Sequence, residues 1–256
     1  METLRRVLVF VAKDLQRSSP QKVQFLQTVV GLLDGADDEL KVKFKLEQNR
    51  FILSPDSSPR GVPLRRPSFC PIKHLSVTEA AAIPLDVRQR GVDVGVAILL
   101  QTSNQRLLLT RRAKHLRIFP NVWVPPGGHI EPNETVLEAG LRELKEETGL
   151  CLDQDQVQTR VLGLWELDLS PSALEVSTCL WAEPRLIRAA LTNEDYGQDS
   201  VRASEVSSDG SLSEVSIPVS VFRASAPDHG PDLERISTGT KYALSLWLQD
   251  LDQDRT

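Results

Sequence analysis

Acidic side chains recur at short spacing in the segment between Gly128 and Leu150. Glu143, Glu146 and Glu147 are three and one residues apart, so a helix would hold their carboxylates close together on its surface. Like charges at this spacing cost about 0.2–0.5 kcal/mol per pair unless a cation lies among them. Mg²⁺ and Mn²⁺ take oxygen ligands of this kind and are commonly shared between carboxylates and a substrate phosphate. The spacing therefore indicates a metal site for phosphate chemistry.

A second interpretation needs no metal, because Arg142 and Lys145 lie within the same acidic segment. Interleaved charges of both signs are typical of a solvated helix face held by ion pairs. Under either interpretation the segment is predicted to be helical. Asn133 is the expected N-cap, Glu134 falls in the first turn, and Gly149 is placed for a C-cap.

The full segment, GHIEPNETVLEAGLRELKEETGL, fills every fixed position of the Nudix box GX5EX7REUXEEXGU, in which U is aliphatic. The chain is therefore identified as a member of the Nudix family. This resemblance implies an α/β fold, an α/β/α sandwich around a mixed sheet. It also implies that Glu143, Glu146 and Glu147 bind Mg²⁺ or Mn²⁺, and that Glu143 serves as or positions the general base. Arg142 would orient a glutamate, and Glu134 would support the loop.

Candidate substrate contacts precede the box. Prolines and paired glycines before the helix force an irregular turn, so the backbone of Gly127 and Gly128 can approach a phosphate closely. Upstream of this turn lies a cationic cluster that suits an oligophosphate, although a solvated face explains it equally well. The cluster consists of Arg111, Arg112, Lys114 and Arg117. We expect Arg111 and Arg112 to contact substrate.

Further stretches resemble one member of the family. They are RRPSFCP from Arg65, RGVDVGVAILLQ from Arg90, LLLTRRAKHL from Leu107, NVWVPPGGHIE from Asn121, LGLWE from Leu162 and RISTGTKYALSLWLQ from Arg235. This resemblance implies hydrolysis of nucleoside diphosphate derivatives. For this member it implies mRNA decapping, the hydrolysis of N7-methylguanosine-capped RNA with release of N7-methyl-GDP.

A different substrate is the alternative. The pattern from Leu108 to Ala113, followed by Arg117 and the Pro126–Gly128 turn, resembles the segment upstream of the box in coenzyme A diphosphatases. Asn121 and Pro125 depart from that pattern, which favours a capped RNA or another nucleotide derivative over coenzyme A.

Composition limits the remaining possibilities. The chain has 256 residues, 40% hydrophobic and 25% charged, as expected for a globular protein. The net charge of −5 provides no general attraction to nucleic acid, so DNA sequence recognition is not expected. Three scattered cysteines argue against a disulfide framework and for a cytoplasmic or nuclear location. No apolar run is long enough to indicate a membrane span or signal peptide.

The predicted organisation has five parts. Residues 1–71 form a small α+β unit, with a strand near the start, a helix capped by Ser19, and a hairpin around Gln48. Residues 72–90 form a linker, and 91–192 the Nudix domain. A flexible loop rich in Ser, Asp and Gly covers 193–234, with one short strand near Val215. Residues 235–256 form a C-terminal helix capped by a threonine such as Thr240.

One segment departs from the family pattern. A buried strand is expected between Glu166 and Glu175, but these residues are separated by only LDLSPSAL, which contains a Ser-Pro break. The chain therefore resembles a shortened form that lacks one inner strand near residues 167–174. Loss of that strand would leave backbone groups unpaired. This predicts an altered substrate pocket, or an inactive isoform.

Overall fold

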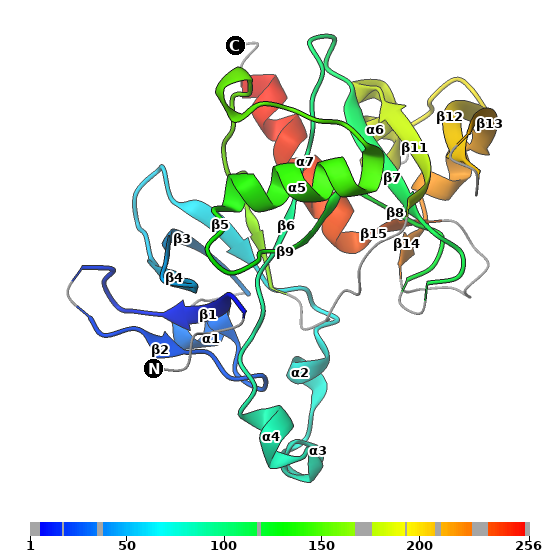
Figure 1. The fold of residues 1–256 in the computed structure, drawn as a ribbon. Helices are drawn as coiled ribbons and strands as arrows, with labels where there is room; N and C mark the ends of the chain where they lie inside the picture. Colours follow the sequence, from blue (N-terminus) through cyan, green and yellow to red (C-terminus); the bar gives the residue numbers. More distant parts are fainter. Residues whose placement is uncertain are drawn as a thin grey trace. The chain divides into compact units, whose positions relative to one another are not determined.

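The computed structural model describes residues 6–16, 18–34, 38–116, 119–166, 176–192, 194–207, 211–226 and 235–253 (Figure 1). The chain divides into two compact units, and neither is continuous in sequence. The first unit comprises residues 1–96, 129–139 and 158–170, and the second comprises 97–128, 140–157 and 171–256. These two units do not coincide with the five consecutive parts of the predicted organisation. The expected gap at residues 167–174 lies outside the described residues.

The first unit is built on a six-stranded sheet with the order β10-β5-β3-β4-β1-β2. Its strands are β1 (Leu8–Val11), β2 (Gln21–Lys22), β3 (Glu39–Glu47), β4 (Arg50–Pro55), β5 (Val62–Arg65) and β10 (Leu164–Trp165). The predicted hairpin is confirmed, because β3 and β4 pair antiparallel around Gln48 and Asn49, which both adopt positive φ. Strand β5 pairs antiparallel with the other edge of β3.

The helix predicted after Ser19 is wrong. The Val23 amide instead donates to the Val9 carbonyl at 3.0 Å, which extends the pairing of β2 with β1. Only α1 (Val29–Leu32) is helical in this stretch, and Thr28 is its N-cap. The apolar spacing that suggested a helix reflects burial, since Val23 and Val30 both lie in the core of this unit.

The predicted linker at 72–90 contains three short helices, α2 (Pro71–His74), α3 (Val77–Ala82) and α4 (Leu85–Arg88). Ser76 and Glu79 form a capping box at the start of α3. None of the three helices has a buried residue.

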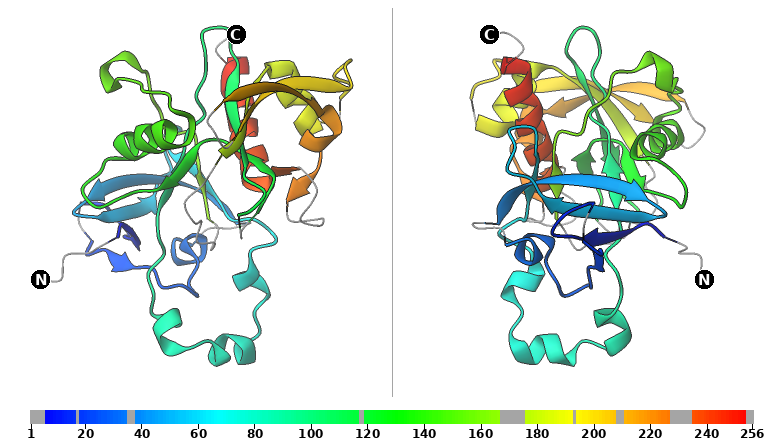
Figure 2. Two further views of the ribbon diagram at one scale, coloured as in Figure 1. Left: turned by 45° about the vertical axis from the view of Figure 1, so that its right-hand side comes forward. Right: turned by 90° about the vertical axis from the view of Figure 1, so that its left-hand side faces the viewer.

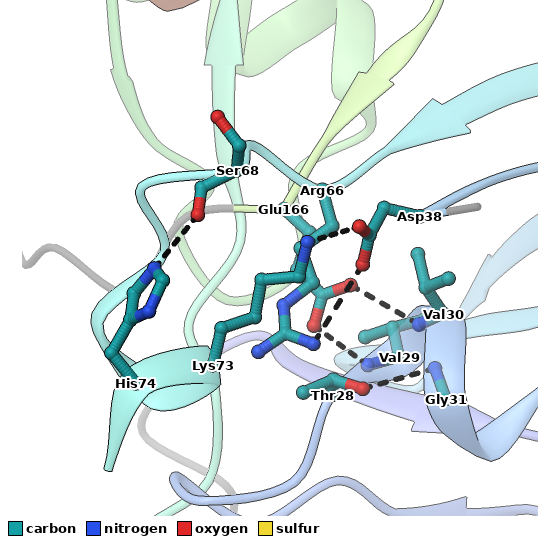
Figure 3. Close-up of polar contacts among 10 residues, drawn as sticks. All are labelled: Thr28, Val29, Val30, Gly31, Asp38, Arg66, Ser68, Lys73, His74 and Glu166. Atoms are coloured by element: carbon teal, nitrogen blue, oxygen red, sulfur yellow. Dashed lines mark hydrogen bonds and ion pairs between the residues drawn. The ribbon is translucent and has the colours of Figure 1, made fainter.

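Glu166 fixes the late segment of the first unit to its early part (Figure 3). Its carboxylate accepts hydrogen bonds from the amides of Val29 at 2.7 Å and Val30 at 3.1 Å. The Glu166 amide donates to the Arg65 carbonyl at 2.8 Å, next to the parallel pairing of β10 with β5. Burial raises the pKa of Glu166, while the two amides and Arg66 oppose the shift. Within residues 158–166, β10 is the strand that carries this attachment.

We expect Glu166→Ala to lower the free energy of unfolding by roughly 1–3 kcal/mol, because two buried amides lose a charged acceptor. Urea denaturation measures this loss. Glu79→Ala is the matched control, since it removes an equivalent acceptor from the exposed helix α3 and should cost less. Equal losses in the two variants would show that burial adds nothing to the Glu166 contacts.

The second unit contains a seven-stranded mixed sheet with the order β13-β12-β11-β7-β8-β15-β14. Its strands are β7 (Leu107–Arg112), β8 (Val122–Val124), β11 (Val176–Ala182), β12 (Ser200–Val206), β13 (Leu212–Pro218), β14 (Ser225–Ala226) and β15 (Arg235–Ser237). Pairs β14/β15 and β15/β8 are parallel, and the other pairs are antiparallel. The α/β class with a mixed sheet is confirmed.

The flexible loop predicted at 193–234 is wrong for the described residues. That stretch contains β12, β13, β14 and the short 3₁₀ helix η2 (Val219–Phe222). In β12, Val201 and Ala203 are buried whereas Arg202 between them is exposed, which is the alternation of a half-buried strand. The Ser-rich composition concealed this alternation because serine is tolerated on an exposed strand face.

Two further helices belong to the second unit. They are α6 (Pro184–Thr192) and α7 (Thr238–Gln253), joined by an ion pair between Arg188 and Asp252 at 2.6 Å. The C-terminal helix is confirmed, but its cap is Ser237, whose hydroxyl accepts from the Thr240 amide at 3.0 Å. Among the described helices, none has the length and apolar character needed to cross a bilayer.

Candidate active site

The helix of the box is α5 (Val136–Thr148), which begins and ends close to the predicted residues. Thr135, rather than Asn133, caps it: the Thr135 hydroxyl accepts from the Glu138 amide at 3.1 Å, and the Glu138 carboxylate accepts from the Thr135 amide at 2.7 Å. Gly149 has a φ of +75° and donates to the Lys145 carbonyl, so the predicted C-cap is confirmed.

Glu134 precedes the helix instead of lying in its first turn. It belongs to the first unit, where its carboxylate accepts from the Glu131 amide at 2.9 Å and closes the loop before α5. A loop-supporting contact of this kind is what the resemblance implied for Glu134.

Arg142 contacts two of the three box glutamates on α5. Its Nη1 lies 2.8 Å from Glu143 Oε1 and 3.3 Å from Glu146 Oε2. The Glu143 side chain is 15% exposed and that of Glu146 is 59% exposed. Arg142 therefore offsets the repulsion between these carboxylates and restrains Glu143, the better buried of the two.

The Glu147 side chain is partly exposed, but both of its carboxylate oxygens are buried. In the part of the chain that the structure describes, neither carboxylate oxygen has a partner of standard geometry. Burial raises the pKa of Glu147 to about 8, and Glu143 and Glu146 act in the same direction. The nearby Gly127 amide and Arg112 guanidinium lower the pKa only in part. An unpaired buried carboxylate is costly unless a cation joins it, so Glu147 has the character of a ligand.

Gly128 provides the space for the Glu143 carboxylate. A Cβ atom at Gly128 would overlap the carboxylate carbon and both oxygens of Glu143. The glycine is thus required because a side chain approaches its backbone closely, and no positive φ is involved. The structure brings Gly127, Gly128, Glu143 and Glu147 together in the second unit.

The donors suit a hard divalent cation, although they are not arranged around one. Across the described residues, no three or more His, Cys, Asp or Glu side chains form a group able to hold a metal ion. Arg142 occupies the position between Glu143 and Glu146, and Glu147 faces inward with free oxygens. Three carboxylates within two helical turns, one of them unpaired, match the oxygen ligands of Mg²⁺ and Mn²⁺. The residues therefore fit the metal on donor chemistry.

Arg111 and Arg112 have different surroundings because successive strand residues point to opposite faces of a sheet. Arg111 donates to Ser177 Oγ at 3.2 Å and pairs with Glu205 at 3.1 Å. Arg112 is 5% exposed and donates to the Phe119 carbonyl at 3.1 Å. The predicted pair of substrate contacts is therefore not one cluster. Arg117 lies outside the described residues.

Sequence reasoning missed two neighbours of Glu147. Arg112 contributes charge to this carboxylate from β7, and Cys179 on β11 is close enough for Glu147 to raise the pKa of its thiol, in addition to burial. Cys179 pairs with Thr110, which lies on the same sheet face as Arg112. The alternation of side chains along β7, which places Thr110 and Arg112 on one face, could be predicted from the sequence. The pairing of β7 with β11, which brings Cys179 to this face, could not.

The chain is similar to several known proteins. The NUDIX domain pattern matches residues 90–195. A "m7GpppN-mRNA hydrolase NUDT17" from Danio rerio is 46% identical, over 98% of this chain and 98% of that protein. The proteins of the same name from Xenopus laevis and Homo sapiens are 42% and 38% identical, covering 98% and 91% of this chain and 97% and 85% of their own lengths.

The relatives are longer within the aligned region. The alignment with the Danio rerio protein runs over 296 positions, whereas this chain has 256 residues, so at least 40 positions of that relative have no counterpart here. This agrees with the shortened form that the sequence indicated.

Proposed function

Because this chain belongs to the Nudix family, we propose that it hydrolyses the m7GpppN cap of mRNA and releases N7-methyl-GDP, with Mg²⁺ or Mn²⁺ as cofactor. The observation that carries the proposal is the 46% identity, over nearly the full length of both chains, to a relative named for this activity. The site supplies the chemistry, since its carboxylates suit a metal bound to a diphosphate. An RNA substrate also favours a cytoplasmic or nuclear location.

In this proposal Glu143, Glu146 and Glu147 hold the metal. When bound, a divalent ion neutralises the diphosphate and lowers the pKa of a bound water. Glu143 serves as or positions the general base, and Arg142 orients Glu143 through their 2.8 Å ion pair. Glu134 maintains the loop that precedes α5.

The substrate contacts complete the proposal. The backbone of Gly127 and Gly128 faces the phosphates. Arg111 and Arg112 contribute positive charge from β7, with Arg112 acting at a distance because it is buried. The inward position of Glu147, close to Gly127 and Arg112, supports this arrangement.

The test is product release from N7-methylguanosine-capped RNA by the purified chain, with and without Mg²⁺ or Mn²⁺. Coenzyme A serves as the competing substrate. We expect metal-dependent release of N7-methyl-GDP and little cleavage of coenzyme A. Preferential cleavage of coenzyme A, or activity without metal, would refute the proposal.

A second candidate follows from the missing aligned positions. In this candidate, the chain is a shortened form that contains the Nudix box but has no hydrolase activity. A restored version, with the absent segment of the Danio rerio relative inserted between Glu166 and Glu175, separates the two candidates. Activity in the restored version alone favours the inactive form, whereas activity in both shows that the sheet tolerates the loss.

A further inference from the structure

The β3–β4 hairpin of the first unit has one apolar face and one mixed face, on which Lys43 and Lys45 lie opposite the buried Ser54 and Ile52. On β3 and β4, the side chains of Val42, Phe44, Leu46, Phe51 and Leu53 belong to the core of the unit. The alternate residues point the other way, because side chains alternate along a strand. Figure 2 shows the two strands side by side, coloured blue to cyan.

Cations outnumber anions among these alternate residues. The cations are Lys41, Lys43, Lys45, Arg50 and Arg65, and the anions are Glu39 and Glu47. Hydrogen bonds from Ser58 lower the pKa of Asp56, just after β4, and the charges of Lys43 and Lys41 lower it further. A cationic excess remains on this face although the whole chain has a net charge of −5. We call Lys41, Lys43, Lys45 and Arg50 the hairpin cations.

The hairpin cations are available to a partner. Lys41 and Lys43 are exposed, and Lys45 is 40% exposed, with an exposed ion pair to Glu47 at 2.7 Å. Exposed ion pairs of this kind contribute little to stability, so exchanging Glu47 for a phosphate costs little. The Arg50 guanidinium lies 5.6 Å from the centre of the Phe10 ring, and its charge also acts on the exposed Glu47 carboxylate.

A cavity of about 380 Å³ adjoins these cations within the first unit. The hairpin contributes Lys45, Glu47, Gln48, Arg50 and Ile52, and the segment before β2 contributes Leu15, Gln16, Ser18, Ser19 and Pro20. Two cations and two hydroxyls can bind a phosphate that displaces the Glu47 carboxylate from Lys45, and Leu15, Pro20 and Ile52 can contact an attached sugar or base. This volume falls within the range of small-ligand sites.

We propose that this face binds the RNA chain that follows the cap, with the hairpin cations on its phosphates and the cavity receiving one nucleotide. The choice of RNA rests on the proposed function. The observation behind the site itself is separate: a local cationic excess on an otherwise anionic chain, next to a cavity lined by Lys45 and Arg50. Electrostatic contacts to phosphates are independent of sequence and depend on salt.

The experiment measures binding of a fluorescein-labelled single-stranded RNA of about twenty nucleotides by anisotropy, in EDTA and over a range of salt concentrations. The test variant is Lys43→Gln/Lys45→Gln/Arg50→Gln in the full chain. The control is Arg106→Gln/Arg188→Gln/Arg202→Gln, which also removes three cations, but from the second unit, where each of them forms an ion pair. Thermal unfolding confirms that both variants are folded.

We expect the hairpin variant to bind roughly tenfold more weakly at moderate salt, with a salt slope smaller by about two, since each lost phosphate contact removes about 0.7. The control should bind like the wild type. Hydrolysis of the cap dinucleotide m7GpppG should be equal in all three proteins, whereas KM for capped RNA should rise in the hairpin variant.

Unchanged affinity and salt slope in the hairpin variant, or an equal loss in the control, would overturn the proposal. The two proposals fail in different ways. If the wild type hydrolyses no capped substrate but the hairpin variant alone loses RNA binding, the proposed function is wrong and the binding face is supported. If m7GpppG is hydrolysed and RNA binding is unaffected, the function is supported and the binding face is refuted.

Discussion

Glu147→Gln is expected to reduce hydrolysis of capped RNA by roughly 10²–10³-fold while leaving the protein folded. The substitution keeps the size of the side chain but removes the buried negative charge that a divalent ion would neutralise. Steady-state release of N7-methyl-GDP at saturating Mg²⁺ measures the effect. Glu138→Gln on the same helix is the control and should retain activity, because Glu138 caps the first turn of α5. Retained turnover in Glu147→Gln would refute its assignment as a ligand.

In the absence of metal, the stability of the wild type should depend on pH in a way that the stability of Glu147→Gln does not. Burial raises the folded-state pKa of Glu147 to about 8 from an ordinary value of 4.5. The resulting stabilisation is fully present below pH 4.5 and is lost as the pH rises through 8. Wild-type stability in EDTA should therefore fall across this window relative to Glu147→Gln. Mg²⁺ should restore the wild type at pH 8 but not the variant, and parallel pH curves in EDTA would contradict the buried carboxylate.

Gly128→Ala is expected to lower kcat by roughly tenfold or more with little loss of stability. The added methyl group overlaps the Glu143 carboxylate, which can move because it is the end of a flexible side chain. A displaced Glu143 no longer has the position that Arg142 holds, and small displacements of catalytic groups are costly. Turnover and the unfolding midpoint, measured on the same preparation, test both parts.

The control for this variant is Gly31→Ala. A methyl group at Gly31 would meet the Thr28 hydroxyl, so the substitution affects the cap of α1 in the first unit. It should lower stability and leave kcat unchanged. A loss of stability in Gly128→Ala as large as its loss of activity would assign Gly128 to the fold rather than to Glu143.

The box helix could be predicted closely because its residues are specified by motif spacing and by local signals. Gly149 ends it as expected. The N-cap of the helix is Thr135 rather than the predicted Asn133. Asn133 takes a φ of +70° and donates its amide to Oδ1 of Asn49, which is far away in sequence. Local propensity could not reveal that contact.

Long-range pairing accounts for the other differences. The Val23 amide donates to the Val9 carbonyl and so extends a strand pairing, although the sequence spacing between Val23 and Val30 fits a helix. Glu166 was only the last residue of a motif until its carboxylate was found on the amides of Val29 and Val30. The sequence showed the positive charge of Arg112, which suggested a direct contact with substrate. It did not show that the Arg112 side chain is buried.

Glu166 and β10 also bear on how the protein can be dissected. The segment that matches the family, residues 90–195, includes β10, but the strand that pairs with β10 and the amides bound by Glu166 precede residue 90. A fragment cut at the family boundary would therefore expose one sheet edge and leave a buried carboxylate without its donors. We therefore expect a fragment of residues 90–195 to be less stable than the full chain, because its folding contacts extend beyond the segment that matches the family.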